Sequence, residues 1–340
     1  MKKFFAALPC CLLLSCCGCG AAQVRQIQNV NTAMGTVIQQ KLYTADSETP
    51  AAREIIGLLR ELEEKQLSKR LDTSEVWALN AAAGREEGGA VSDSMEEILT
   101  GCLEMWQKSE GTFDVTLGTV TGLWDIDGWA SGERGETFVP PEEEQLSKAL
   151  ESCGSGRLDL RDGCLYLPRG MQLDLGAVGK GIALDHISDY LREREEITGA
   201  IISLGGSVLT YGQKPNGSAW NVGIANPADT SSCIGVLALE GQWYVSTSGD
   251  YERYVELDGV RYHHIIDPAT GYPADSGVAG VTILARDGFL SDALSTACFI
   301  LGAEKGMALA EECGAEALFV GKDGSITMSK GMEAYYRPGE

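Results

Sequence analysis

Residues 172–185 combine the residue types that could hold a diphosphate. A short apolar strand containing Asp174 runs into Gly176, Gly179 and Gly181, and a helical pattern follows at once. Amides at a helix N-terminus carry partial positive charge, and Lys180 adds a full one, so an anion would bind well there. The spacing fits neither a Walker A loop nor the dinucleotide fingerprint. A tight strand-to-helix connection without a ligand is the alternative, and these residues alone leave both open.

A second candidate for chemistry lies late in the chain, where residues 289–301 have a helical pattern. Asp292 and Thr296 are four residues apart and therefore share a helix face. A carboxylate and a hydroxyl one turn apart are hard oxygen ligands that suit Mg²⁺, which often shares a diphosphate. The alternative is a carboxylate near the helix N-terminus and a threonine bonded to its own backbone.

The chain has three histidines, and two of them, His263 and His264, precede an Asp-Pro turn. His186 is far away in the sequence, so a zinc site of three histidines would need a chance meeting. A single titrating histidine in a cleft is the simpler interpretation. A serine hydrolase that uses Ser246 or Ser248 with His264 and Asp267 is disfavoured because no G-x-S-x-G motif is present.

Residues 111–118 place two polar side chains, Thr112 and Asp114, around the apolar Phe113. This arrangement suggests a wall of a ligand site. A buried turn capped by Asp114 would give the same pattern.

The charge balance limits the partners of the protein. The 340 residues include 49 acidic and 27 basic ones, for a net charge of −22 at pH 7. A broad nucleic-acid surface needs clustered Lys and Arg, so nucleic-acid binding is excluded. An anionic ligand would need positive charge that is supplied locally, by a metal ion, Lys180 and helix dipoles together.

The N-terminus indicates export. Lys2 and Lys3 precede an apolar run that is too short to span a bilayer. Residues 13–16 resemble a bacterial lipobox ending at Cys16, although Cys17 or Cys19 could compete for the lipid. We therefore expect residues 1–22 to be a lipoprotein signal and anchor region, with the mature protein on the extracytoplasmic face of the membrane; an ordinary cleaved signal is the alternative. The later cysteines form no zinc signature, although Cys153 and Cys164 could bridge.

The remaining residues, 23–340, are predicted to form one large α+β domain. Apolar periodicity predicts helices over residues 51–68, 94–110 and 289–301, and from the cradle to about residue 196. Strands are expected over residues 37–43, in a hairpin turning at Asp162-Gly163, and in five segments between residues 200 and 247. Because helices and strands alternate irregularly, a mostly antiparallel sheet flanked by helices is favoured.

Taken together, these segments resemble the ApbE-type FAD:protein FMN transferase family. No single segment is specific, but seven or eight in the right order are. The resemblance covers nearly all of the mature chain and is carried by residues 33–36, 74–80, 111–116, 173–185, 203–206, 223–227, 246–250, 264–273 and 292–297.

The resemblance implies an α+β fold with FAD in a cleft and Mg²⁺ on its diphosphate. The metal would be held by the backbone oxygen of Ala177, the carboxylate of Asp292 and the hydroxyl of Thr296. His264 matches the histidine near the reacting phosphate, so His264 and Asp292 would be the catalytic residues. The residues that would line FAD are Met34, Thr112, Phe113, Asp114, Asp174, Lys180 and Ile265.

Two positions depart from the family pattern. Where many relatives have an aromatic residue, this chain has residues 68–71, in which Arg70 could stack on a ring instead. Ser207 replaces the Asn or Asp that often follows the paired glycines.

The implied reaction is Mg²⁺-dependent transfer of FMN from FAD to a threonine or serine hydroxyl of an acceptor protein, with release of AMP. The resemblance implies a membrane-associated electron-transfer subunit as acceptor. Two alternatives use the same site: hydrolysis of FAD to FMN and AMP, and a flavin-binding lipoprotein without enzymatic activity.

Overall fold

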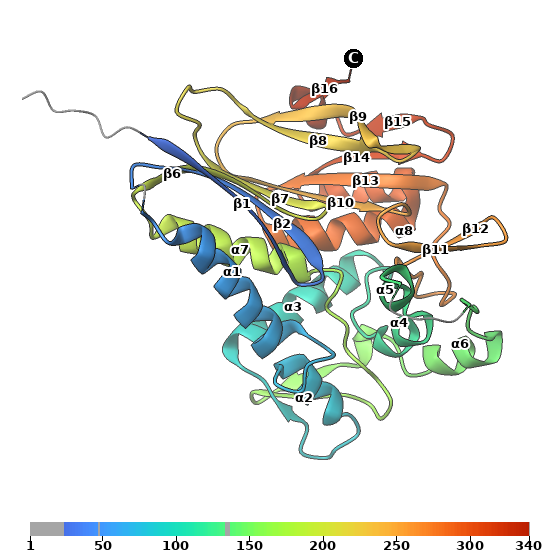
Figure 1. Ribbon diagram of the computed structural model, residues 1–340. Helices are drawn as coiled ribbons and strands as arrows, with labels where there is room; N and C mark the ends of the chain where they lie inside the picture. Colours follow the sequence, from blue (N-terminus) through green and yellow to red (C-terminus); the bar gives the residue numbers. More distant parts are fainter. Residues whose placement is uncertain (1–23, 47, 133–136, 340) are drawn as a thin grey trace, which may run out of the picture.

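The computed structural model describes residues 24–46, 48–132 and 137–339 (Figure 1). The predicted signal and anchor region, residues 1–22, lies outside the described residues.

An eight-stranded antiparallel sheet crosses the molecule in the order β1-β2-β6-β7-β10-β13-β14-β15 (Figure 1). All eight residues of β13 are buried, because this strand has layers on both faces. The strands are β1 (Arg25–Ala33), β2 (Thr36–Thr44), β6 (Ile197–Leu204), β7 (Ser207–Gly212), β10 (Trp243–Gly249), β13 (Val278–Ala285), β14 (Glu316–Gly321) and β15 (Ile326–Met328).

Helices cover one face of this sheet and bury the largest apolar core (Figure 1). Each has an apolar stripe that faces the sheet or a neighbouring helix. Side-chain oxygens of Ser74, Ser92 and Asp287 cap the N-termini of α2, α3 and α8. The helices of this layer are α1 (Ala51–Leu62), continued by a π-helical turn (Glu63–Leu67), α2 (Glu75–Ala81), α3 (Asp93–Lys108), α7 (Gly179–Arg192) and α8 (Gly288–Glu312).

A three-stranded sheet, ordered β16-β9-β8, packs on the other face of the main sheet. Trp220 and Leu237 from the small sheet meet Val245 and Leu284 from the large one in a second apolar cluster. The strands are β8 (Trp220–Asn226), β9 (Asp229–Leu239) and β16 (Tyr336–Pro338), with the 3₁₀ turn Met332–Ala334 before the last.

A third apolar cluster surrounds the buried Trp124 and packs several further segments together. They include α4 (Gly118–Trp124), α5 (Ile126–Ala130), α6 (Glu143–Leu150) and the hairpin of β11 (Tyr254–Leu257) and β12 (Val260–His263). A small sheet, ordered β3-β5-β4, completes the fold with β3 (Gly89–Ala90), β4 (Asp159–Arg161), β5 (Cys164–Tyr166) and the 3₁₀ turn Ser155–Arg157.

The predicted α+β class with a mostly antiparallel sheet is confirmed. Asp162 and Gly163 form the predicted hairpin turn, with φ of 52° and 69°. Strand β1, which pairs with β2 along its full length, was not predicted. The predicted end of α7 is four residues too late, since the helix ends at Arg192. Cys153 and Cys164, which could have bridged, are free cysteines.

Within the described part of the chain, α8 is the helix with the length and apolar composition of a membrane span. More than half of its most apolar window is buried inside the domain, against β10 and β13. It is therefore the core helix of this fold.

Candidate active site

The crossing of α7 and α8 creates the centre of the site. A Cβ on Gly181 would lie 2.1 Å from the carbonyl oxygen of Gly288, so the two helices touch backbone to backbone at this point. Asp185 in α7 accepts hydrogen bonds from the N–H groups of Gly288 (2.9 Å) and Phe289 (2.8 Å), which fixes the start of α8. The predicted phosphate cradle and the predicted metal-binding helix thereby form one site.

Asp292 lies at this crossing with only 2% of its surface exposed. Its Oδ2 accepts a hydrogen bond of 2.9 Å from the N–H of Gly181, and its Oδ1 accepts one of 2.9 Å from the hydroxyl of Ser207. Lys180 Nζ lies 3.6 Å from Oδ1. Ser207, which departs from the family pattern, therefore orients the carboxylate.

The three predicted metal ligands line one cleft and suit a hard cation. Regular helix geometry would direct the N–H of Gly181 at the carbonyl of Ala177, but this donor is used by Asp292, so the carbonyl can serve another partner. Thr296 lies one turn after Asp292 on the same face of α8 and lines the same cleft. A carbonyl, a carboxylate and a hydroxyl are the oxygen donors that Mg²⁺ prefers.

Among the described residues, no group of three or more His, Cys, Asp or Glu side chains is placed to hold a metal ion. A cation at Asp292 would therefore rely on backbone and hydroxyl oxygens and on waters or substrate phosphate, which is typical of Mg²⁺. The three histidines do not converge: His263 is buried, and His186 is exposed on α7. The zinc alternative finds no support in this arrangement.

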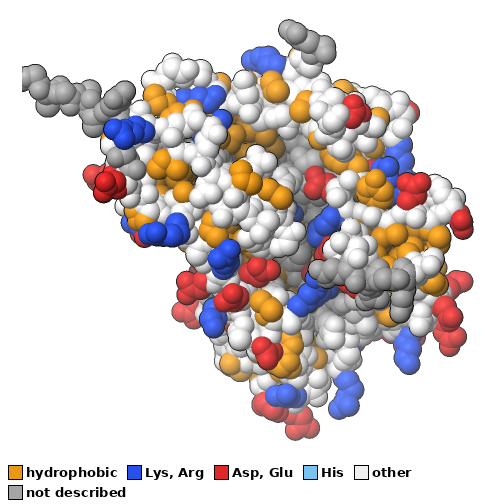
Figure 2. Space-filling model, in the orientation of Figure 1, with side chains coloured by type: hydrophobic (Ala, Val, Ile, Leu, Met, Phe, Trp, Pro, Cys, Tyr) orange, Lys and Arg blue, Asp and Glu red, His pale blue; other side chains and the backbone are white. Residues whose placement is uncertain are grey.

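The cleft has a volume of about 440 Å³, in the range of small-molecule sites. Figure 2 shows it as a hollow near the middle of this face, with basic side chains on its walls. Of the residues predicted from the sequence, the lining includes Met34, Asp114, Asp174, Ala177, Lys180, His264, Ile265, Asp292 and Thr296.

Two predicted FAD-lining residues do not line the cleft. Phe113 is 1% exposed and belongs to the main apolar core. Thr112 also lies outside the lining, at the end of the turn that follows α3. The pattern of polar residues around Phe113 is thus explained by core packing.

Asp114 lines the cleft, but hydrogen bonds within the fold occupy its carboxylate. Its Oδ1 accepts from the N–H (2.8 Å) and hydroxyl (2.6 Å) of Thr116 and from the hydroxyl of Ser155 (2.7 Å). The structure therefore favours the capped turn that the sequence had left as an alternative.

Met34 reaches the cleft from a strained turn between β1 and β2. Met34 and Gly35 have φ values of 51° and 66°, the pattern of a type I′ turn, which is unusual for methionine. The N–H of Met34 donates to Glu63 Oε2 (3.0 Å) in the π-helical turn after α1. Left-handed backbone and π-helical turns are both enriched at functional sites.

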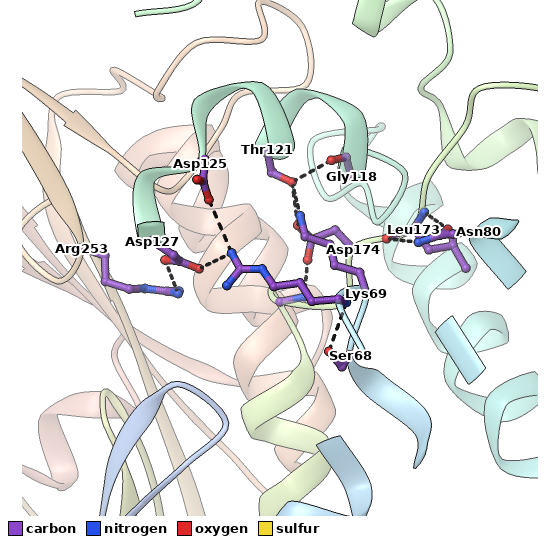
Figure 3. Close-up of polar contacts among 12 residues, drawn as sticks. Ser68, Lys69, Asn80, Gly118, Thr121, Asp125, Asp127, Leu173, Asp174 and Arg253 are labelled. Atoms are coloured by element: carbon purple, nitrogen blue, oxygen red, sulfur yellow. Dashed lines mark hydrogen bonds and ion pairs between the residues drawn. The ribbon is translucent and has the colours of Figure 1, made fainter. Parts of the chain in front are cut away.

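Asp174 is held in a network with Lys69 and Thr121 (Figure 3). Lys69 Nζ lies 2.6 Å from the Asp174 carboxylate and donates a hydrogen bond of 2.7 Å to the hydroxyl of Thr121. This hydroxyl in turn donates a hydrogen bond of 2.7 Å to the same carboxylate oxygen. Burial alone would raise the pKa of Asp174, but the charge of Lys69 and hydrogen bonds from Lys69, Thr121 and the N–H of Gly176 outweigh it and lower the pKa to about 2. The carboxylate is therefore ionised and neutralised by Lys69.

Asn80 positions the segment that carries Asp174, which is not the predicted strand and has only an isolated bridge at Gln172. Its side chain accepts from the N–H of Leu173 (2.6 Å) and donates to the carbonyl of Leu173 (3.0 Å), as a neighbouring strand would (Figure 3). No pattern in the sequence predicted a role for Lys69, Thr121 or Asn80. They come from separate segments, so no spacing links them.

His264 lies at the cleft in its neutral form. Burial lowers its pKa well below the ordinary value, and the positive charges of Arg253 and Lys180 act in the same direction. Its Nδ1 lies 3.2 Å from the carbonyl oxygen of Arg253. Because a carbonyl only accepts, Nδ1 carries the hydrogen, and Nε2 keeps a lone pair that can accept a proton.

Arg70 forms part of a charged cluster at the edge of the cleft. Its guanidinium lies 3.7 Å from Asp125 and 3.8 Å from Asp127, and Arg253 Nη1 lies 2.8 Å from Asp127 (Figure 3). Two carboxylates therefore hold the Arg70 side chain, which the sequence suggested could stack on a ring. The cluster brings two basic residues to the cleft in a strongly acidic protein.

The serine hydrolase alternative is not supported by the geometry. The hydroxyl of Ser246 pairs with Ser291 at 2.9 Å, and that of Ser248 pairs with Ser295 at 2.8 Å. Both serines thus bond to α8, while His264 Nδ1 bonds to a backbone carbonyl.

Comparisons with known proteins identify the family of the chain. A sequence model of the ApbE family matches residues 34–319. The chain is 36% identical to an FAD:protein FMN transferase of Treponema pallidum, over 95% of this chain and 92% of the relative, and 35% identical to one of Klebsiella pneumoniae, over 90% and 92%.

Solved structures are similar over the same length. The ApbE protein of Thermotoga maritima superposes with a TM-score of 0.82 at 29% identity, covering 92% of this chain and all of that one. The flavin transferase ApbE of Vibrio cholerae gives 0.80, also at 29% identity, with 92% and 100% covered. By its sequence, its fold and the residues gathered at the crossing of α7 and α8, the chain belongs to the ApbE family.

Proposed function

We propose that this protein transfers FMN from FAD to a serine or threonine hydroxyl of an acceptor protein and releases AMP. One observation carries the proposal: Lys180, His264 and Asp292 line a single cleft in a chain whose relatives are named FAD:protein FMN transferases. The cleft thus offers a cation, a neutral base and a metal-binding carboxylate to one diphosphate.

The diphosphate of FAD would bind between the N-terminus of α7 and the Asp292 turn of α8. Lys180 and the backbone amides of α7 supply positive charge there. Mg²⁺ held by Ala177, Asp292 and Thr296 would neutralise charge on the diphosphate and polarise the reacting phosphorus. Ser207 and the N–H of Gly181 keep the Asp292 carboxylate oriented for this role.

The transfer forms one bond and breaks one. The acceptor oxygen bonds to the FMN phosphorus, the P–O bond to AMP breaks, and AMP leaves with the electron pair. The hydroxyl proton passes to Nε2 of His264, which is neutral and has a free lone pair. General-base catalysis of this kind contributes roughly 100- to 10,000-fold.

We further propose that the protein is exported and anchored by a lipid on Cys16, Cys17 or Cys19, and that its acceptor is the membrane-associated electron-transfer subunit that the family resemblance implies. The proposal rests on the basic, apolar and cysteine-containing pattern of residues 1–22. Metabolic labelling with a radioactive fatty acid tests it, with each cysteine replaced by Ala in turn. A protein that is never labelled would contradict the anchor.

The reaction is tested with FAD, MgCl₂ and a peptide library in which each member carries one central threonine or serine. We expect AMP release together with peptides whose mass has increased by an FMN phosphoester. The Asp292→Asn variant, which keeps the size of the side chain, should produce neither. FMN and AMP without any modified peptide would instead indicate hydrolysis of FAD.

A further inference from the structure

A second cavity of about 310 Å³ adjoins the cleft on the far side of the Gly205-Gly206 turn. It lies between the main sheet, which contributes Ile201, Ser203 and Val208, and β8 of the small sheet. Four residues, Gly205, Gly206, Thr247 and Glu252, line both this cavity and the cleft. These four residues therefore lie at the boundary between the two spaces.

One wall of the second cavity is the free edge of β8. In the described part of the chain, β8 pairs with β9 alone, so its other edge has no neighbouring strand. Asn221, Gly223 and Ala225 of β8 line the cavity. Figure 1 shows β8 in the layer above β7 and β10.

The direction of the β8 backbone follows from the pairing of β9. The N–H of Ala238 donates to Tyr335, on the side of β9 away from β8. Ala238 is opposite Asn221, so this is a non-hydrogen-bonded pair, in which the backbone groups of both residues point away from each other. The N–H and C=O groups of Asn221 and, two residues on, of Gly223 thus point to the free edge.

The chemistry of the lining indicates what this cavity binds. It contains no Lys or Arg, and its one charged residue is the acidic Glu252. A phosphate group would be repelled rather than bound there. Glycines and small side chains instead leave room for the uncharged backbone of a peptide. The unpaired N–H and C=O groups at alternate residues of β8 match the pairing of an added strand.

Building on the proposed function, we propose that the acceptor protein binds here: an extended segment pairs with the free edge of β8 and presents its hydroxyl to the cleft across Gly205-Gly206. Its backbone bonds to Asn221 and Gly223, which makes recognition largely independent of side chains. The serine or threonine then lies beside Glu252, at the boundary between the two cavities.

Hydrogen exchange locates the segment without requiring transfer. The probe is the best-modified library peptide with its threonine replaced by Ala, added in excess to the enzyme with FAD and MgCl₂. We expect slower exchange of the amides in residues 220–226. Protection elsewhere on the surface, while the threonine peptide is still modified, would overturn the docking site and leave the proposed function intact. Protection of residues 220–226 by FAD alone would assign the cavity to FAD and also overturn it.

A pair of variants tests the backbone contact. Asn221→Pro removes an edge N–H that β9 does not use, and proline is tolerated on edge strands. We expect KM for the threonine peptide to rise roughly tenfold, the upper end of what one hydrogen bond contributes. Asn221→Ala keeps the N–H and should change KM less than twofold.

Affinity for FAD, measured by fluorescence titration, should be unchanged in both variants, and their melting temperatures show whether they are folded. Equal KM values for the two variants would overturn the strand pairing. If the wild-type enzyme modifies no library peptide, the proposed function fails and this inference fails with it.

Discussion

Gly181 and Asp292 are 111 residues apart in the sequence and are joined by a hydrogen bond of 2.9 Å from the N–H of one to the carboxylate of the other. The bond is possible because glycine at residue 181 lets α8 approach the backbone of α7. The carboxylate proposed to bind the metal and the helix terminus proposed to bind the diphosphate are therefore positioned by the same contact.

Gly181→Ala should consequently destabilise the protein and disturb the site. The added Cβ would lie 2.1 Å from the carbonyl of Gly288, so the helices must separate. We expect a loss of about 1–3 kcal/mol in the free energy of unfolding, measured by urea denaturation. Gly57→Ala is the control, because its Cβ meets nothing within 4 Å on the exposed face of α1. That change should stabilise the protein by roughly 0.5–1 kcal/mol. Equal stabilities of the two variants would contradict the tight crossing.

The Mg²⁺ requirement of the reaction should depend on the hydroxyl of Thr296 and not on its methyl group. Thr296→Ser keeps the oxygen ligand, whereas Thr296→Val replaces it with a methyl of similar size. We expect Thr296→Val to need about tenfold or more Mg²⁺ for half-maximal AMP release, as is common when a metal site is perturbed. Thr296→Ser should be within about threefold of the wild type. The Mg²⁺ dependence of AMP release is measured at saturating FAD, and EDTA should abolish it in all three proteins.

His264 should keep its base function below neutral pH. Its pKa is lowered well below the ordinary value, so Nε2 remains unprotonated as the pH falls through the range in which an exposed histidine gains a proton. We expect kcat for transfer to change less than about twofold between pH 7.5 and 6.0. NMR of the imidazole, assigned with His264→Gln, gives the pKa directly. A titration near the ordinary value would refute the proposed protonation state.

Lys69 should determine how Asp174 responds to acid. The pKa of Asp174 is about 2 in the folded protein and about 3.9 in an unfolded chain. A lowered folded-state pKa stabilises the protein above the unfolded value, and this stabilisation is lost as the pH falls towards 2. In Lys69→Met, the charge and the hydrogen bond of Lys69 are lost, so only the hydrogen bonds from Thr121 and Gly176 oppose burial and the pKa of Asp174 is higher than in the wild type. The stability difference between wild type and Lys69→Met should therefore grow as the pH rises above 2 and become constant once the pH exceeds the pKa of Asp174 in both proteins.

Urea denaturation at half-unit pH intervals measures this difference. Asp174→Asn is the matched control, since it removes the titrating group. In its background, Lys69→Met should give a difference that does not depend on pH in this window. A pH-dependent difference there would show that another group is responsible.

Local patterns in the sequence predicted the parts of the site that lie within one element. Asp292 and Thr296 share a face of α8 because of their spacing, and α7 begins within the glycine-containing segment 176–181, at Gly179. The Asp162-Gly163 turn was also predicted from its residue types. In each case the determining interactions act over a few residues, so periodicity and turn chemistry suffice.

Contacts between distant segments could not be predicted in this way. Lys69 and Thr121 reach Asp174 from 105 and 53 residues away, and the role of Ser207 depends on a bond to Asp292 across 85 residues. Strand β1 was missed because none of its first eight residues is buried, which leaves little apolar alternation to detect. Phe113 was misplaced because a core phenylalanine and a ligand-lining one look alike in sequence.

The position of β1 at the margin of the main sheet has a consequence for where the enzyme can work. The strand begins at Arg25, shortly after the cysteines proposed to carry lipid. The few intervening residues can span at most on the order of 20–30 Å, even when fully extended. With the proposed lipid attached, a tether this short would confine the domain to the first layer of space outside the bilayer. Acceptors of the anchored protein would then need to expose their hydroxyl groups within a molecular diameter of the lipid headgroups.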